Sequence, residues 1–357
     1  MTTQAVHRSK PWLDTSGRMP GPWLLGILWL LLLFAFLFAA GQGAYRINVT
    51  QVPAWLLGLE PVHSAGERLV FFNIRLPRLV LAVFAGAGLA LAGALMQGLF
   101  RNPLADPGLI GVSSGAALAA GAAIVLGAAW FPDLPRMLGS WALVSMSFAG
   151  GLAVTAVIYA LSRSEGGSRV GLMLLAGIAV NALAGAGLGM LNFLATDEQL
   201  RNFQFWMLGS LGAARWSAVA LVGALVSVAL LAGLRLARPL NALALGEGQA
   251  VLMGVPVERV KRQAVVLAAL AVGSVTATTG IIGFVGLVAP HMVRLVAGPD
   301  HRWVLPGSAL LGAVLVLLAD AAARTWAQPA ELPLGVLTAL MGVPFFIALL
   351  RTQRGGW

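Results

Sequence analysis

The sequence predicts an all-α integral membrane protein with about ten transmembrane helices. Of its 357 residues, 59% are hydrophobic and only 10% are charged, and the mean hydropathy is +0.87, which is far from the composition of a soluble domain. Apolar runs of about 20 residues, the length that crosses about 30 Å of hydrocarbon, follow one another along the chain. The predicted spans are 22–41, 76–97, 108–129, 139–161, 170–194, 216–234, 263–279, 281–297, 304–323 and 333–350.

The predicted spans form one transmembrane domain, 22–350, between polar tails at 1–21 and 351–357. The first apolar run is too long for the core of a signal peptide, so we expect a retained first helix. The apolar stretch 263–298 would be about 54 Å long as one helix, which is too long. We therefore expect the chain to turn near Thr278, Thr279 and Gly280.

Basic residues predict the orientation. With the N-terminus in the cytoplasm, 15 of the 23 Lys and Arg residues fall on the cytoplasmic side and 8 on the other side. Because short cytoplasmic loops carry the excess of Lys and Arg, both termini are expected in the cytoplasm. Arg75 and Arg78 make the opposite face basic as well, so an acidic partner is expected there.

The polar interval 235–262 (RLARPLNALALGEGQAVLMGVPVERVKR) is the longest between two apolar runs. Its Gly and Pro residues predict short helices joined by turns, and the orientation places them in the cytoplasm. One interpretation is a docking surface for a cytoplasmic partner. The other is an ordinary loop whose basic residues only set the topology.

Composition and motifs argue against several functions. The net charge of +10 lies in short loops without interleaved aromatic residues, so nucleic acid is not an expected partner. The chain has no cysteine, which excludes disulfides and thiolate chemistry. No GxxxxGK[ST] loop is present, so ATP should not be hydrolysed on this chain. The four histidines show no metal-ligand spacing, and neither an enzyme nor a metal site is predicted.

Polar residues inside the spans leave alternatives open. Asp320 lies in an apolar run with Arg324 four residues later, which favours a structural ion pair near the outer surface over a proton relay in a secondary transporter. Asn181 either hydrogen-bonds to a neighbouring helix or faces a pathway. Trp206 and Trp216 flank 208–212, which predicts a short interfacial helix there.

A set of motifs in consistent order carries a family resemblance. The segment 280–291 (GIIGFVGLVAPH) resembles the iron-chelate and vitamin B12 permease family of bacterial ABC importers. Further motifs agree at 75–78 (RLPR), 101–108 (RNPLADPG), 244–247 (ALGE), 298–302 (GPDHR) and 331–335 (ELPLG).

The resemblance implies a type II ABC importer permease fold in a homodimer with a central pathway. It implies two cytoplasmic ATPase subunits, which carry ATP and Mg²⁺, a periplasmic binding protein, and a place in the bacterial inner membrane. By position, the residues that match the family's ATPase-coupling helices and their surroundings are Ala244, Leu245, Gly246, Glu247, Met253, Gly254, Val255 and Arg259.

The resemblance also implies roles at the two ends of the pathway. Outward arginines that pair with glutamates of the binding protein match Arg75, Arg78 and Arg324, and Arg324 can serve Asp320 as well. The residues that match inner gates or the pathway are Asn102, Leu104, Gly167, Ser168 and Asn181.

Substrate identity rests on one region. The segments 197–203 (DEQLRNF) and 205–212 (FWMLGSLG) look most similar to haem permeases of the family. Haem is therefore the expected cargo, with a ferric siderophore or vitamin B12 as alternatives, and no cofactor is expected on this chain. A proton-coupled transporter built around Asp320 remains the alternative of another class.

Overall fold

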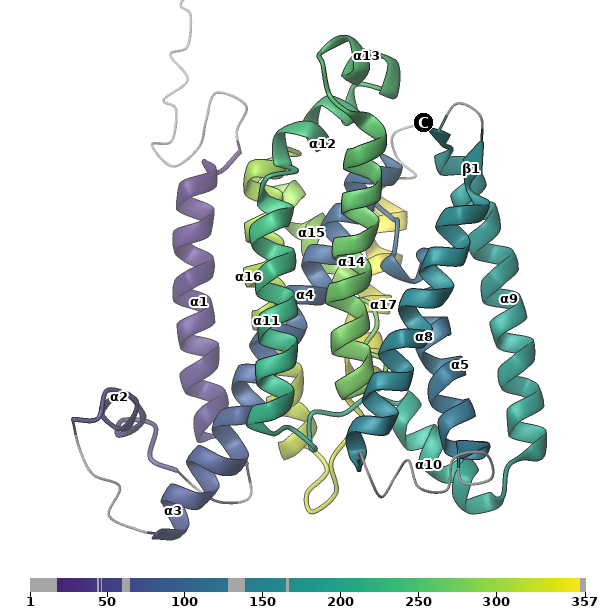
Figure 1. The fold of residues 1–357 in the computed structure, drawn as a ribbon. Helices are drawn as coiled ribbons and strands as arrows, with labels where there is room; N and C mark the ends of the chain where they lie inside the picture. Colours follow the sequence, from purple (N-terminus) through teal and green to yellow (C-terminus); the bar gives the residue numbers. More distant parts are fainter. Residues whose placement is uncertain are drawn as a thin grey trace, which may run out of the picture.

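The computed structural model describes residues 18–43, 45, 47–59, 65–127, 139–164 and 167–353. Most of the polar tail at 1–21 and the last four residues of the chain lie outside the described residues. Within the described part, the chain is a bundle of roughly parallel and antiparallel helices (Figure 1). Its first half contains α1 (Gly21–Gly41), α2 (Val52–Leu56), α3 (Ala65–Leu69), the π-helix η1 (Val70–Arg75), α4 (Leu76–Phe100), the 3-10 helix η2 (Pro107–Ile110), α5 (Val112–Val125), α8 (Ser140–Leu161) and α9 (Val170–Leu194).

The second half contains α10 (Asp197–Met207), α11 (Trp216–Leu234), α12 (Ala237–Ala244), α13 (Glu247–Leu252), α14 (Val257–Thr279), α15 (Val285–Ala297), α16 (His301–Thr325) and α17 (Leu334–Gln353). The described strands are β1 (Arg163–Ser164) and β2 (Gly167–Ser168), an antiparallel pair between α8 and α9.

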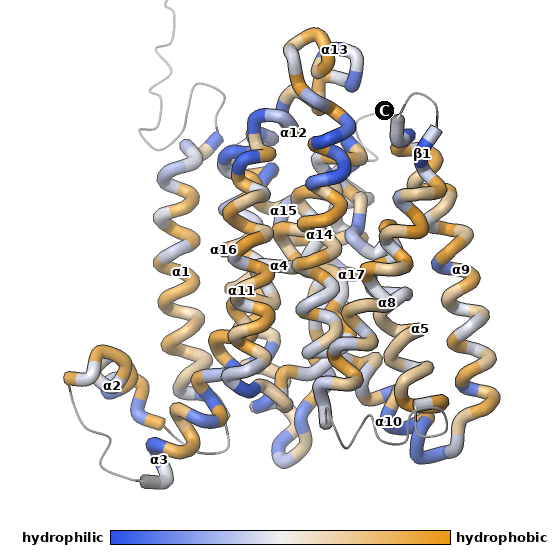
Figure 2. The backbone as a smooth tube through the Cα atoms, viewed as in Figure 1, coloured by the Kyte–Doolittle hydropathy of each residue, from blue (hydrophilic) through white to orange (hydrophobic). Residues whose placement is uncertain are grey.

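Seven helices in the described part are long and apolar enough to cross a membrane, and α5, α15 and α17 are shorter apolar helices there. Together they correspond to the ten predicted spans. Hydrophobic residues form a belt around the bundle, while hydrophilic residues gather toward its two ends (Figure 2). The protein is therefore an all-α, multi-pass membrane protein.

Several predicted boundaries change. The span predicted at 76–97 is part of one continuous helix from Gly66 to Phe100. The turn expected near Thr278 is confirmed, since α14 ends at Thr279 and Gly280 has φ +73°. However, α15 begins at Val285, not at 281, because Phe284 also has a positive φ and the backbone cannot be helical there.

The short helix predicted over 208–212 is wrong. The helix lies just before it, as α10, and begins at a capping box in which the Thr196 and Gln199 side chains satisfy each other's backbone N–H groups. The 208–212 segment instead forms a turn. Its Ser210 N–H donates to the Thr279 carbonyl at 2.7 Å.

The centre of the bundle is α4, which packs against α16, α14, α11 and α15. Glycines make the closest approaches. A Cβ on Gly86 would collide with the Gly312 carbonyl, and one on Gly93 would collide with the Gly286 carbonyl. Small residues allow membrane helices to pack backbone to backbone, so these glycines fix how α16 and α15 lie on α4.

Candidate functional site

The segment between α11 and α14 projects from one end of the bundle (Figure 1). It consists of α12 and α13 with turns at Gly246, φ +114°, and Gly254, φ +77°. Positive φ values are accessible to glycine at little steric cost, so these two residues allow the sharp changes of direction. The prediction of short helices joined by turns over 235–262 is confirmed.

Hydrogen bonds anchor α12 to the start of α16. The Asn241 amide donates to Asp300 Oδ1 at 2.7 Å and accepts from the His301 N–H at 2.9 Å. Asp300 caps α16 by accepting from the Arg302 N–H at 2.9 Å. Burial alone would raise the pKa of the Asp300 carboxyl, but hydrogen bonds from Arg302 and Asn241 lower that pKa to about 2. The anchor is therefore ionised at neutral pH.

The tip of the projection is apolar and exposed. Leu245 is 67% exposed, Leu252 82% and Met253 61%, and the tip lies beyond the apolar belt (Figure 2). Large apolar side chains in a patch outside the bilayer region are typical of a protein-binding surface. Val251 is exposed as well. We call the set of Leu245, Val251, Leu252 and Met253 the apolar tip.

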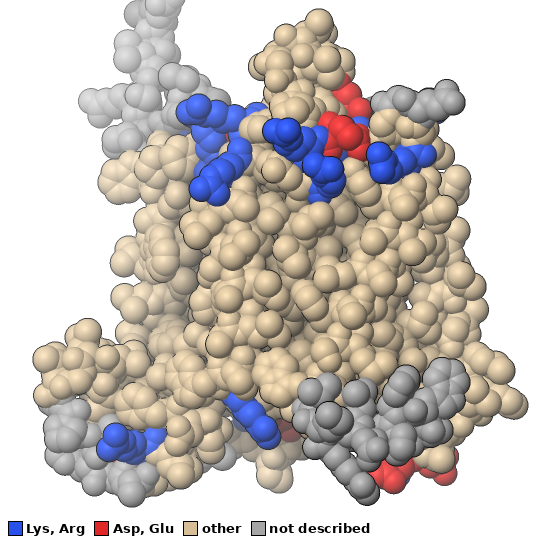
Figure 3. Space-filling view, in the orientation of Figure 1, with Lys and Arg blue, Asp and Glu red and all other residues tan. Residues whose placement is uncertain are grey.

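The structure brings most of the expected ATPase-coupling residues together at this projection. Ala244, Leu245 and Gly246 end α12 and form the turn, Glu247 begins α13, and Met253, Gly254 and Val255 follow it. Arg259 lies on the first turns of α14 and is exposed. Lys and Arg side chains gather at this same end, directly beside the uncharged belt (Figure 3).

An arginine and carboxylate cluster lies at the opposite end of the bundle. Arg78 Nε donates to Asp320 Oδ1 at 2.9 Å, and its two NH groups contact both oxygens of Glu331 at 2.8 and 2.9 Å. Arg324 Nε donates to Asp320 Oδ2 at 3.0 Å. The expected ion pair of Asp320 with Arg324 is confirmed, and Arg78 shares it.

Arginines at this end of the bundle also cap the C-terminal end of α1. Arg75 donates to the Ala40 and Tyr45 carbonyls at 2.7 and 2.8 Å, and Arg324 donates to Ala39 and Gln42 at 3.1 and 2.9 Å. The last carbonyls of a helix lack partners within it, so these cations satisfy them. The three arginines expected at the outer face thus lie together, largely buried and engaged within the chain.

Glu331 is the more accessible acid of this cluster, with a 46% exposed side chain. Its hydrogen bonds with Arg78 hold the pKa of the Glu331 carboxyl below its usual range. Asp320 is fully buried between two arginines. That geometry is typical of a structural ion pair, and it leaves the proton-relay alternative without support.

The residues expected at the gate and along the pathway lie in three different segments: the turn after α4, the strand β2 and the helix α9. Asn102 follows α4 in a tight turn in which its Oδ1 accepts from the Leu104 N–H at 2.9 Å. Gly167 and Ser168 form β2, where Gly167 has φ +108°. Asn181 lies on α9, donates to the Gly108 carbonyl at 3.2 Å and accepts from Ser114 Oγ at 2.5 Å. In this conformation Asn181 holds α9 to η2 and α5.

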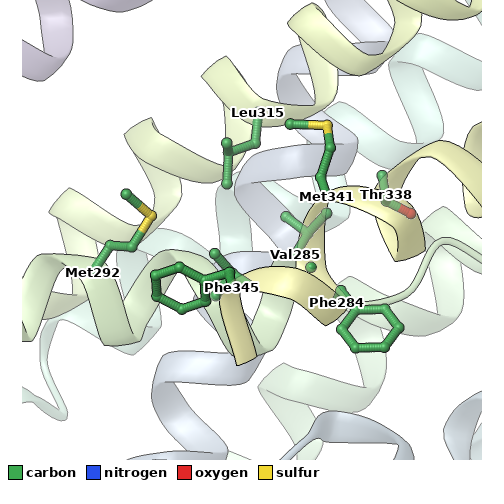
Figure 4. Close-up of a pocket in the computed structure, with 9 residues that line it drawn as sticks. Phe284, Val285, Met292, Leu315, Thr338, Met341 and Phe345 are labelled. Carbon is green, nitrogen blue, oxygen red and sulfur yellow. The ribbon is translucent and has the colours of Figure 1, made fainter. Parts of the chain in front are cut away.

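An apolar cavity of about 150 Å³ lies between α15, α16 and α17 (Figure 4). It holds no charged side chain, and its one hydroxyl, Thr338, donates to the Gly335 carbonyl at 3.1 Å. The cavity therefore offers no group that would recognise the charged substituents of a chelate. Its lining residues are Phe284, Val285, Val288, Met292, Leu315, Thr338, Met341, Gly342 and Phe345.

Sequence reasoning missed the partners of the expected residues. It assigned no partner to Glu331, which binds Arg78, or to Lys261, which is buried and binds Glu247 at 2.8 Å. A signal for Lys261 was present in the sequence. Lys261 shares the i, i+3, i+4 and i+7 face of α14 with Val257, Val260 and Ala264, all of them buried.

Comparisons with known proteins agree with this architecture. A model of the FecCD transport family matches residues 31–352. The hemin transport system permease protein HmuU of Yersinia pestis is 44% identical over 341 residues, which cover 95% of this chain and 98% of the relative. The vitamin B12 import system permease protein BtuC of Citrobacter koseri is 42% identical over 291 residues, 82% of this chain and 85% of the relative.

A solved structure of a metal-chelate type ABC transporter in an inward-facing conformation matches this fold with a TM-score of 0.81. The two chains are 31% identical, and the match covers 93% of this chain and 99% of that one. The family model, the relatives and the fold all extend over most of the chain. The chain belongs to the FecCD transport family, the permease subunits of ABC importers.

Proposed function

We propose that this chain is the permease subunit of an ABC importer that carries haem from the periplasm to the cytoplasm by alternating access. It works as a homodimer in the inner membrane, with both termini in the cytoplasm. Two ATPase subunits bind and hydrolyse ATP with Mg²⁺ on the cytoplasmic side, and a periplasmic binding protein delivers the chelate. Haem is cargo, and the chain itself holds no cofactor.

The observation that carries the proposal is the apolar tip. It stands outside the belt, where lipid cannot cover it, and its base is fastened by Asn241 to α16 and by Glu247 to α14. An exposed apolar surface on a fixed base suits a protein partner that pushes on it. We assign this surface to the ATPase, with Arg259 beside it.

Haem is favoured as cargo by the similarity to HmuU, which extends over nearly the full length of both chains. Vitamin B12 is the second candidate because BtuC is nearly as similar over a shorter region. A ferric siderophore is the third, within the metal-chelate class of the similar solved structure.

We assign docking of the binding protein to the opposite end, at Arg75, Arg78 and Arg324. Internal acceptors hold these cations in place, so a carboxylate of the partner would meet a pre-organised positive site. It would compete with the exposed Glu331 for Arg78. Such charge complementarity mainly affects encounter rate and salt dependence.

We assign the cytoplasmic gate to two turns, one with Asn102 and Leu104 and the other with Gly167 and Ser168, and a place beside the pathway to Asn181. The second copy would pack near α9. Of the long apolar helices, α9 is the least buried in the single chain, and a Cβ on Gly185 or Gly189 would meet open space. Small residues of this kind suit close helix packing in a membrane.

Uptake into proteoliposomes tests the proposal. The vesicles contain this chain with its partner ATPase, ATP inside and the binding protein outside, and haem, cobalamin and a ferric siderophore are compared. We expect haem to accumulate only when ATP is present. Uptake of cobalamin or siderophore instead would replace the cargo and keep the mechanism, whereas uptake without the ATPase would contradict the importer assignment.

A further inference from the structure

The side chain of Lys261 is buried at the cytoplasmic end of α14. The side chain is only 3% exposed, and burial makes its charge costly unless that charge is paired. Its Nζ donates to Glu247 Oε2 at 2.8 Å and to the Ser168 backbone carbonyl at 2.6 Å. One partner begins α13 and the other ends β2, so a single ammonium group joins two segments that are 79 residues apart in sequence.

A second residue of α14 also binds Ser168, in the hairpin that β1 and β2 form. Glu258, three residues before Lys261, accepts hydrogen bonds from the Ser168 N–H at 2.9 Å and from Ser168 Oγ at 2.8 Å. It also accepts from the Tyr159 hydroxyl of α8 at 2.7 Å. Ser168 is therefore bound through its N–H, its carbonyl and its hydroxyl, all by side chains of α14.

The hairpin is short, so its own strand pairing contributes little to its position. Its strands have two residues each, β1 (Arg163–Ser164) and β2 (Gly167–Ser168), and α9 begins two residues after Ser168. Lys261 and Glu258 therefore help to set the position of the first turn of α9, together with the Arg169 N–H, which donates to the Ser162 carbonyl at 3.1 Å.

These contacts limit how the segments can move. If α13 moved without the hairpin, Lys261 would lose one of its two partners while still buried. Removing one partner of a buried charge is strongly unfavourable. The motion with the smallest penalty moves α13, the start of α14 and the hairpin together.

We propose that Lys261 is the positioning residue that connects the ATPase-docking projection to the gate hairpin. A push on the apolar tip reaches the first turn of α9 through Glu247, Lys261 and Ser168, with Glu258 holding Ser168 in register. This inference rests on the proposed function, because it assumes that the ATPase acts on α13.

The test uses the full complex in proteoliposomes with Lys261→Met, which removes the charge and keeps an unbranched side chain. Two quantities are measured: the number of substrate molecules imported per ATP hydrolysed, and the distance between spin labels on Arg169→Cys of the two copies, with and without ATP. We expect ATP hydrolysis to continue while the import ratio falls at least about fivefold, the lower range of typical coupling factors. The ATP-dependent distance change should shrink in parallel.

Arg262→Met is the matched control, since it also removes a positive charge but from an exposed neighbour on the same helix, and it should keep the wild-type ratio. Glu247→Gln is a second variant in case Lys261→Met does not fold. It weakens the same ion pair at the half-exposed Glu247 side chain, and it should also lower the number of substrate molecules imported per ATP.

If Lys261→Met and Glu247→Gln both keep the wild-type import ratio and the wild-type distance change, the inference is overturned. The proposed importer function would not be affected by that result. Failure of the unmodified complex to import any chelate with ATP is a different result, because it would contradict the proposed function itself.

Discussion

At the scale of single residues, the buried charges of this protein are held in place by several partners at once. Asp320 is fully buried and lies between Arg78 and Arg324, each within 3.0 Å. Such a cluster is not a large source of stability in itself, because desolvation offsets most of the attraction. Removing Asp320 is a different matter, because Arg324 would stay buried without the carboxylate that pairs with it, and Arg78 would keep only Glu331.

We therefore predict that Asp320→Asn destabilises the protein by about 3–5 kcal/mol. The amide keeps the shape of the carboxylate but leaves two arginines beside a neutral group. The measurement is the apparent melting temperature of the purified protein in detergent. Asp197→Asn is the control because Asp197 is exposed in the first turn of α10, where its charge contributes under about 1 kcal/mol. Equal melting temperatures for the two variants would contradict the role of Asp320.

At the scale of helices, contact between glycine backbones decides the packing. Gly93 of α4 lies directly against the Gly286 carbonyl of α15. A methyl group at Gly93 has no space and would have to displace the backbone of α15. Interiors transmit such strain because they are already close-packed.

Gly93→Ala should lower stability despite the better helix propensity of alanine. Overpacking costs about 1–3 kcal/mol or more, whereas alanine gains about 1 kcal/mol over glycine in a helix. Gly26→Ala is the control, since no atom lies near its Cβ position on α1. Yield of monodisperse protein and melting temperature in detergent are the measurements, and the prediction fails if Gly93→Ala equals or exceeds Gly26→Ala in both.

Most helices could be predicted from hydropathy, because a span must satisfy its backbone hydrogen bonds internally. The span at 170–194 matches α9 residue for residue. Predictions failed where tertiary contacts set the backbone. The Phe284 backbone has φ +65° and delays α15, and the 208–212 segment is held as a turn by contacts with Thr279, Leu334 and Gly335.

At the scale of the whole molecule, the projection of α12 and α13 and the Arg78 cluster lie at opposite ends of the bundle (Figure 1). The start of α1 lies at the projection's end, where Met19 N–H donates to the Val296 carbonyl at 3.1 Å. The proposed orientation puts that end in the cytoplasm.

Because the chain has no cysteine, one introduced thiol reports its own side of the membrane. We predict that Gln249→Cys in α13 is protected from a membrane-impermeant maleimide in spheroplasts and reacts once the membrane is opened. Ala330→Cys, in the exposed turn before α17, should react in intact spheroplasts. The opposite pattern would invert the topology and contradict both docking assignments.

Hydropathy and motif order were enough to predict the class of protein, the number of spans and the family, because hydrophobic length and ordered motifs are local properties of the chain. The sequence also indicated the expected coupling segment and the ion pair of Asp320 with Arg324, since both lie within short stretches. Only the tertiary structure showed that Arg78 binds Glu331, 253 residues away, and that Lys261 joins α13 to the hairpin. Those pairings depend on which helices become neighbours, and helix packing between distant segments leaves no signal in the spacing of either segment alone.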